Sequence, residues 1–164
     1  MKKLLILAIA LVSLIPFART TFAAPTVVKA TTNVTRLSFK GTMRSTETYG
    51  IDFPTMSATA SGSGEATSLG QFTIKYGSEV NLLDLSWNET AQFIGVNGDS
   101  LLAKGIGQAT EDRTPTMFNV VEIYTITGGT GRFTGASGTI TLHRLFSITT
   151  GATFSTFEGF IFIP

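Results

Sequence analysis

Three charged residues interrupt the apolar faces of strand-like segments, and they are the residues of this chain best placed to do chemistry. The even-numbered positions of residues 117–127 are apolar or aromatic except for Glu122, and those of residues 139–149 are apolar except for Arg144. Glu89 interrupts a third such face. A carboxyl group beside a guanidinium group inside a protein can orient a polar group of a ligand or transfer a proton. Glu122 and Arg144 are therefore the candidate catalytic residues.

The connection between the two segments is predicted to bring Glu122 and Arg144 face to face. Both are equally far from Phe133, so a hairpin that is symmetric about Phe133 puts them directly opposite each other on neighbouring strands. A register shift of one residue would send one of them to the other face of the sheet. The pair also has a purely structural interpretation, an ion pair that fixes the register inside a filled barrel, because buried charges are usually paired whatever the function.

The functional interpretation of these charges is a ligand-binding pocket with apolar walls and a small polar spot. Pockets for small molecules combine aromatic and aliphatic walls with a few polar groups that orient the ligand. Glu89, Glu122 and Arg144 are the expected polar groups, and the expected ligand is an apolar small molecule. The expected walls are aromatic residues on the apolar faces of the predicted strands: Tyr76, Trp87, Phe93 and Tyr124.

The elements that must position these residues are strands, because apolar and polar residues alternate over most of the chain. No stretch after residue 23 supports a helix of useful length. About eight strands in hairpin order predict an all-β fold, a single antiparallel up-and-down β-barrel, with a two-sheet β-sandwich as the alternative. The predicted strands are Thr32–Met43, Thr55–Thr67, Phe72–Leu82, Leu85–Val96, Ser100–Thr110, Met117–Thr127, Thr139–Thr149 and Ala152–Ile163.

Glycine-rich segments are predicted to turn the chain between strands. Asn97-Gly98 stands between two predicted strands, and both residue types tolerate the positive φ of the mirror-image hairpin turns. A second stretch packs five glycines around one phenylalanine, which indicates a tight, bulged connection. A glycine-rich loop that binds phosphate would need a helix after it, and strand-like alternation follows here instead. The residues of this structural turn are Gly128, Gly129, Gly131, Phe133, Gly135 and Gly138.

The first residues have the layout of a secretory signal peptide. A basic start, an apolar run over residues 4–17 and small residues up to Ala23 match its three regions. The apolar run is too short to span a bilayer comfortably. Cleavage after Ala23 would leave residues 24–164, a length that suits one β-barrel domain. We therefore predict a secreted or periplasmic protein.

Composition argues against several classes of partner and cofactor. Residues 1–23 carry three of the 12 basic residues, so the remaining nine stand against 11 acidic residues and the net charge is −2. This charge gives no electrostatic basis for binding nucleic acid or an anionic membrane. One histidine and no cysteine leave no cluster for a transition metal, so we predict no metal and no cofactor. A serine triad has little support, because the chain has no Gly-x-Ser-x-Gly motif.

The glycine-rich turn also carries a family resemblance. Its pattern from Gly128 to Gly138, Gly-Gly-Thr-Gly-x-Phe-x-x-Ala-x-Gly, resembles the turn of plant dirigent proteins and of allene oxide cyclases. The similarity continues through residues 139–145 to Phe157-Glu158-Gly159. Residues 67–73 and Asn97-Gly98-Asp99 look like parts of a set of uncharacterised secreted bacterial proteins with the same closing motif.

This resemblance implies a barrel and two kinds of activity. A protein like allene oxide cyclase would be an isomerase that steers the cyclisation of a reactive apolar ligand, and a dirigent-like protein would orient radical intermediates made by another enzyme. The matched residues form a turn and not a reacting centre, so no catalytic residue is carried over. We therefore predict a non-enzymatic binding or structural module for an apolar small molecule or partner, with the cyclase-like isomerase as the alternative.

The last predicted strand is apolar on both faces, with Phe154, Phe160 and Phe162 on one side and Phe157 and Ile161 on the other. A homo-oligomer, a trimer or dimer, would cover the outer side, and the resemblance implies trimers. A small outer-membrane barrel is a further alternative, because such barrels also have a signal peptide and alternating strands. The strand faces that lie opposite the apolar faces carry charged residues, and the strands have no aromatic girdles. Both features argue against a membrane location.

Overall fold

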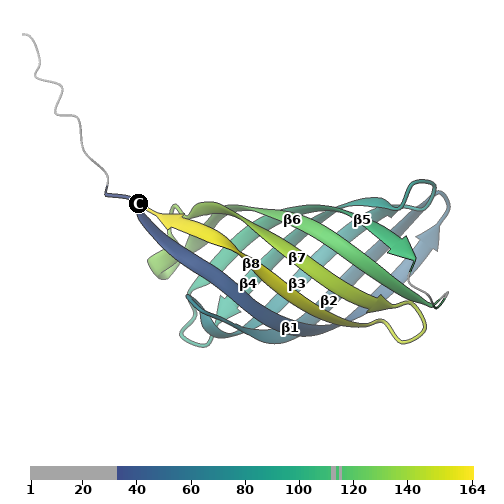
Figure 1. The fold of residues 1–164 in the computed structure, drawn as a ribbon, viewed down its shortest axis with the longest axis horizontal. Helices are drawn as coiled ribbons and strands as arrows, with labels where there is room; N and C mark the ends of the chain where they lie inside the picture. The colour runs from purple at the N-terminus through teal and green to yellow at the C-terminus, as the bar shows by residue number, and fades with distance from the viewer. Residues whose placement is uncertain (1–32, 112–113, 115) are drawn as a thin grey trace, which may run out of the picture. The chain divides into compact units, whose positions relative to one another are not determined.

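The computed structural model describes residues 33–111, 114 and 116–164, which form one closed barrel of eight antiparallel strands (Figure 1). Strands that are consecutive in sequence pair with each other, and the last strand pairs with the first. The predicted up-and-down barrel is confirmed, and the alternative β-sandwich is wrong, because all eight strands belong to one closed sheet. The strands are β1 (Thr35–Asp52), β2 (Thr55–Ala66), β3 (Gly70–Asn81), β4 (Ser86–Gly95), β5 (Ser100–Glu111), β6 (Met117–Thr130), β7 (Ser137–Ser147) and β8 (Ala152–Ile163).

The predicted signal peptide, residues 1–23, lies outside the described residues. In the described part of the chain, no helix has the length and apolar character needed to cross a membrane. The single helical element there is a short 3-10 turn, η1 (Gly131–Phe133).

Strand β1 is longer than the sequence pattern predicted. It continues past Met43 to Asp52 and keeps alternating, with Ser45 and Glu47 buried and their neighbours exposed. The prediction ended at Met43 because the inward positions beyond it are polar. These positions stay in the strand because β2 and β8 both pair with this part of β1, which satisfies its backbone hydrogen bonds.

One end of the barrel, which we call the closed end, is sealed by the turns after β2, β4 and β6. Leu69, Phe133 and Ala136 from these turns are buried, and they belong to a core cluster with aromatic residues of the strands. Phe39, Phe93 and their neighbours make edge-to-face and stacked contacts in this cluster, with ring centroids 5.3–6.3 Å apart. Figure 1 shows the C-terminus and the β6–β7 turn at this end. This half of the barrel is filled with side chains.

The glycine-rich segment forms the β6–β7 connection. Element η1 folds across the closed end and turns Phe133 into the core, where it is fully buried. Gly131 has a φ of +59°, which a side chain would strain. Arg132 holds the turn in place: its Nη2 donates to the carbonyl oxygen of Ser68 (2.7 Å), and its Nε lies 3.3 Å from a carboxylate oxygen of Asp99. The three turns of the closed end are thereby tied together.

The register of this hairpin differs from the prediction by two residues. Glu122 lies opposite Leu142, and Arg144 lies opposite Val120, so the hairpin is symmetric about Arg132 and not about Phe133. The reason is that the chain uses η1 to bring Phe133 inward, which shifts the centre of the turn by one residue. A shift of two residues keeps both side chains on the inner face, where diagonal neighbours are within reach of long side chains.

The Asn97-Gly98 hairpin is present, but its turn type differs from the prediction. Gly98 has a φ of +87°, whereas Asn97 is not among the described residues with positive φ. The Gly98 backbone N–H donates to the Gly95 carbonyl oxygen (2.9 Å), and the Gly95 N–H donates to that of Asp99 (2.9 Å). This pattern is that of a type I turn followed by a glycine bulge, which needs only one residue with positive φ.

Phe133 is predicted to be the main stabilising residue of the glycine-rich turn. Phe133→Ala should lower the free energy of unfolding by about 3–5 kcal/mol, because it leaves a cavity at the fully buried closed end. Urea unfolding followed by circular dichroism measures the change. As a control, Phe53→Ala makes the same truncation at an exposed position between β1 and β2 and should cost at most about 1 kcal/mol. Equal losses for the two variants would contradict a sealing role for Phe133.

Candidate functional site

A cluster of charged side chains occupies the middle of the barrel, with Arg144 at its centre. The guanidinium group reaches inward from β7 and contacts carboxylates from three other strands. Its Nη1 lies 2.5 Å from Glu47 Oε1 on β1, and its Nη2 lies 2.7 Å from Glu122 Oε1 on β6 and 3.9 Å from Glu89 Oε2 on β4. All four residues are buried. The cluster therefore links four strands through one cation.

Aromatic residues donate hydrogen bonds to each of the three carboxylates. The Tyr76 hydroxyl donates to Glu47 Oε1 (2.6 Å), and the Trp87 indole Nε1 donates to Glu122 Oε1 (3.0 Å). The Tyr124 hydroxyl donates to Glu89 Oε1. Each carboxyl group thus has one aromatic donor, and Glu47 and Glu122 also accept a hydrogen bond from Arg144, which partly replaces the hydration lost on burial.

Several polar atoms of the cluster remain without a hydrogen bond. These buried atoms are Glu89 Oε2, Glu122 Oε2 and Arg144 Nε, together with Ser155 Oγ nearby. The cluster also holds more acidic than basic groups, since three carboxyl groups surround one guanidinium. Such an imbalance in a low-dielectric interior favours proton uptake by one of the acids.

Burial sets the protonation of the cluster. Burial, and secondly the nearby charge of Glu122, raises the pKa of Glu89 to about 8, so Glu89 is protonated at neutral pH. Burial also raises the pKa of Glu122, although Arg144 and the Trp87 hydrogen bond act in the opposite direction. For Arg144, burial favours the neutral form, but the carboxylates of Glu122, Glu47 and Glu89 outweigh it and raise the pKa above its ordinary value. Arg144 is therefore a permanent cation.

Two glycines of β5 make room for these large inward side chains. A Cβ on Gly107 would lie 2.8 Å from Glu122 Cγ and 2.8 Å from Trp87 Cζ2, and one on Gly105 would lie 3.0 Å from the Tyr124 ring. Gly105 pairs with Glu89 and Gly107 with Glu122, so the strand between these two glutamates places no side chain in the lumen at this level. The sequence Lys104-Gly105-Ile106-Gly107 places its glycines at the inward positions of a strand for this steric reason.

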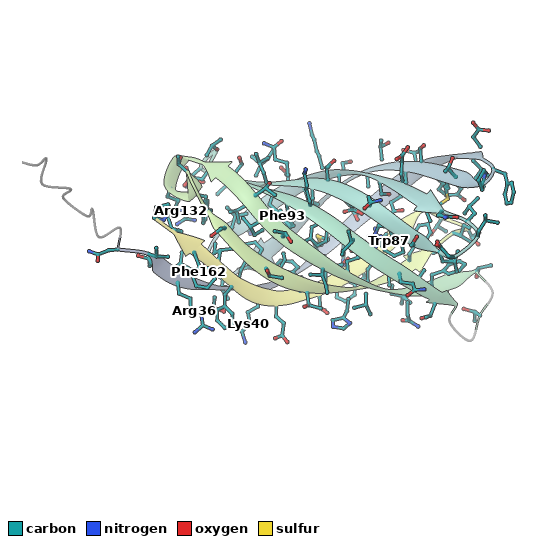
Figure 2. The ribbon with its side chains drawn as sticks, turned by 90° about the horizontal axis from the view of Figure 1, so that it is seen from above. Arg36, Lys40, Trp87, Phe93, Arg132 and Phe162 are labelled. Carbon is teal, nitrogen blue, oxygen red and sulfur yellow. The ribbon has the colours of Figure 1, made fainter. Side chains whose placement is uncertain are left out.

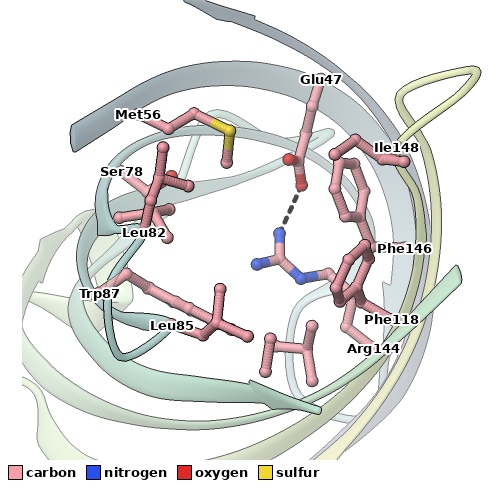
Figure 3. Close-up of a pocket in the computed structure, with 13 residues that line it drawn as sticks. Glu47, Met56, Ser78, Leu82, Leu85, Trp87, Phe118, Arg144, Phe146 and Ile148 are labelled. Atoms are coloured by element: carbon pink, nitrogen blue, oxygen red, sulfur yellow. Dashed lines mark hydrogen bonds and ion pairs between the residues drawn. The ribbon is translucent and has the colours of Figure 1, made fainter. Parts of the chain in front are cut away.

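Beyond the cluster, on the side away from the closed end, the barrel contains a pocket of about 90 Å³ (Figure 3). We call this side the pocket end. Glu47 and Arg144 are the charged residues of its wall, and the ion pair between them points into the space. The rest of the wall is mainly apolar, and its larger members are Leu82, Leu85, Trp87, Phe118, Phe146 and Ile148. Leu82, Leu85 and Ile148 are partly exposed, so they mark the side of the pocket nearest to solvent.

The structure separates the seven candidate binding residues into three groups. Trp87 and Arg144 line the pocket. Phe93 lies in the closed half, packed against Phe39 and Phe72. Figure 2 shows Trp87 farther than Phe93 from the closed end, which Arg132 marks. The remaining four belong to the charged cluster between these two levels: Tyr76, Glu89, Glu122 and Tyr124.

Sequence analysis missed Glu47, the carboxylate that faces the pocket. Its signal was present, since Leu37, Phe39, Met43, Ser45 and Glu47 continue one alternating face. Following the alternation through the polar stretch after Met43 would have identified Glu47 as a charge on an inward face. The neighbouring Ser45 is also inward, and its hydroxyl hydrogen-bonds the Tyr76 hydroxyl (2.9 Å).

The arrangement is suited to holding and orienting a ligand. The pocket offers an apolar wall, one carboxylate and one guanidinium, while the other two glutamates lie behind them. In the described part of the chain, no group of three or more acidic, histidine or cysteine residues has a geometry that could hold a metal ion.

Glu89 is predicted to make the stability of the barrel dependent on pH. Its carboxyl pKa is about 8 in the native state against an ordinary value of 4.5, so the native state binds the proton more tightly than the unfolded state. The free energy of unfolding should therefore be highest below pH 4.5 and fall as the pH rises toward 8. Glu89→Gln should remove much of this fall, and its gain in stability over the wild type should be at least about 1 kcal/mol larger at pH 9 than at pH 5.

Urea unfolding at a series of pH values measures this difference. The matched control is Glu65→Gln, which changes an exposed residue on the outer face of β2 and should leave the pH dependence unchanged. A pH dependence that is the same in Glu89→Gln and the wild type would show that Glu89 does not take up the proton.

In fold, the barrel is similar to the solved structure of the pterocarpan synthase dirigent protein GePTS1. The two chains share 15% sequence identity and align with a TM-score of 0.54, over 88% of this chain and 98% of that chain. Neither a protein-family model nor a curated protein matches the sequence. At this level of identity the likeness concerns the fold alone, and that fold is the eight-stranded barrel of a dirigent protein.

Proposed function

We propose that this protein is a non-enzymatic binding module that holds a small apolar molecule in the pocket end of its barrel. The observation that carries the proposal is the contrast between the two halves of the lumen. The closed half is packed with aromatic side chains, whereas the other half retains a pocket with an apolar wall and one ion pair. Interiors are normally close-packed, so an apolar space beside buried charges is best explained by an occupant.

The size of the pocket suggests what it accepts. A volume of about 90 Å³ suits a short branched chain or part of a ring. Engineered apolar cavities of about 150 Å³ take up benzene. A longer ligand would place one end in the pocket and extend past the partly exposed residues Leu82, Leu85 and Ile148.

The surroundings of Glu122 support binding over turnover. Glu122 is 1% exposed, does not line the pocket, and its Oε1 already accepts hydrogen bonds from Arg144 and Trp87. A general base must come within hydrogen-bond reach of the proton that it removes. An isomerase like allene oxide cyclase is therefore the second choice, and it would have to use Glu47 and Arg144, the charged groups at the pocket wall.

Export and self-association complete the proposal. Residues 1–23 support cleavage and release into the periplasm or the medium. The outer face of β8 exposes Phe154, Phe160 and Phe162, each at 37–42%, and this face supports a dimer or trimer.

Trp87 provides a direct test of binding, because it is the single tryptophan of the chain and lines the pocket. Titration with toluene should change its fluorescence in a saturable way. Ala109→Leu places a larger side chain in the pocket wall and should weaken toluene binding at least about tenfold, a change of about 1.4 kcal/mol. Gln108→Leu makes a comparable change at the neighbouring exposed position and should leave binding unaltered. Toluene binding that Ala109→Leu does not weaken, or no saturable change in the wild type, would contradict the proposed pocket function.

Native mass spectrometry of the protein purified without detergent from its own source tests the other two parts. We expect the mass of a chain that starts at Ala24, in dimers or trimers, with an apolar molecule carried along. Recovery only in detergent would instead favour the outer-membrane barrel. A monomer without residues 1–23 would support export and contradict self-association.

A further inference from the structure

We propose that the pocket selects ligands with a cationic head, the class of small apolar amines, and that Glu47 receives the ammonium group. This inference rests on the proposed binding function and goes further, because it names the charge of the ligand and the residue that recognises it. Four features of the pocket and its surroundings carry it.

The first feature is the charge of the cluster. Glu47, Glu89 and Glu122 stand against Arg144 alone, and the hydroxyls of Tyr76 and Tyr124 add no positive charge. Apart from Glu89, the cluster still holds two carboxyl groups, those of Glu47 and Glu122, against a single guanidinium. A cation entering the pocket would balance this excess, whereas an anion would increase it.

The second feature is that both Nη groups of Arg144 already donate to protein acceptors. Its Nη1 donates to Glu47 (2.5 Å) and to the Tyr76 hydroxyl (3.2 Å), and its Nη2 donates to Glu122 (2.7 Å). Its Nε is fully buried, so a ligand in the pocket does not reach it without displacing protein atoms. A carboxylate ligand would have to share this guanidinium with Glu47 and Glu122, and its negative charge would lie close to theirs.

The third feature is an acceptor on Glu47 that faces the pocket. Glu47 Oε1 accepts from both Arg144 and Tyr76, whereas no donor among the described residues reaches Oε2. Glu47 is 8% exposed and lines the pocket, and Figure 3 shows its carboxylate pointing into the space. A carboxylate oxygen at the wall of an apolar pocket is a strong acceptor for an ammonium group.

The fourth feature is the aromatic wall around this acceptor. Trp87, Phe118 and Phe146 line the same pocket, and their ring faces can stabilise a cation that has left water. The Arg144 guanidinium carbon already lies 5.5 Å from the centre of the Trp87 ring, so this part of the wall tolerates positive charge.

A series of four ligands that share one ring tests the charge preference. Toluene, benzyl alcohol, benzylamine and benzoate differ in the group on the ring, and Trp87 fluorescence at pH 7 gives a dissociation constant for each. We expect benzylamine to bind at least about tenfold more tightly than toluene, with benzyl alcohol between them, because the ammonium gains a charge-assisted hydrogen bond. Benzoate should bind more weakly than toluene.

Glu47→Gln tests the residue assigned to the ammonium group. This variant should reduce the preference for benzylamine over toluene to about threefold or less while toluene still binds, because it removes the charge and keeps the shape. Glu79→Gln, which alters an exposed glutamate on the outer face of β3, should keep the full preference and serves as the matched control. If Glu47→Gln does not fold, the ligand series on the wild type decides alone.

The outcomes separate this inference from the proposed function. Benzoate binding as tightly as benzylamine, or a benzylamine preference that survives in folded Glu47→Gln, overturns the inference while toluene binding still supports the pocket. The loss of binding for all four ligands overturns the binding function itself.

Discussion

The burial of one guanidinium group is the constraint on which the rest of this barrel depends. Arg144 cannot stay charged in the lumen without partners, and its partners come from β1, β4 and β6. A register slip of one residue in any of these strands would move a carboxylate to the outer face and leave charge unpaired inside. The ion pairs therefore specify the order and register of the strands more strongly than they stabilise the fold, since much of their attraction offsets desolvation.

The cluster also divides the lumen into two halves with different roles. On one side, Phe133 and the turns of the closed end complete an aromatic core that supplies apolar burial. On the other side, toward the pocket end, the side chains do not fill the lumen and leave a pocket. A barrel of eight strands has an interior just wide enough to be filled by side chains or to hold one small ligand. In this barrel one half is filled and the other retains a pocket. The close-packed side chains of the filled half form a rigid base for the pocket.

Alternation of apolar and polar residues predicted the closed barrel and identified Glu89, Glu122 and Arg144 as inward charges. The register of β6 against β7 was not predictable in the same way, because it depends on how η1 folds over the closed end to bury Phe133. Glu47 was missed because the inward positions of β1 are polar where the strand reaches the cluster. The position of the pocket depends on how far side chains from eight strands reach, which no local pattern records.

The structural and the functional interpretations of the charged residues apply to different members of one cluster. Glu122 is fully buried, holds Arg144 from β6 and accepts a hydrogen bond from Trp87, so it positions both a strand and a pocket wall. Glu47 holds the same arginine from the other side but keeps one oxygen toward the pocket. Glu47 and Glu122 both pair with the Arg144 guanidinium, so a charge placed beside Glu47 also changes the electrostatic environment of Glu122. The proposed ligand binding would thus be coupled to the register of the barrel through Arg144, and a ligand that supplies positive charge would relieve the excess of acid that the fold itself creates.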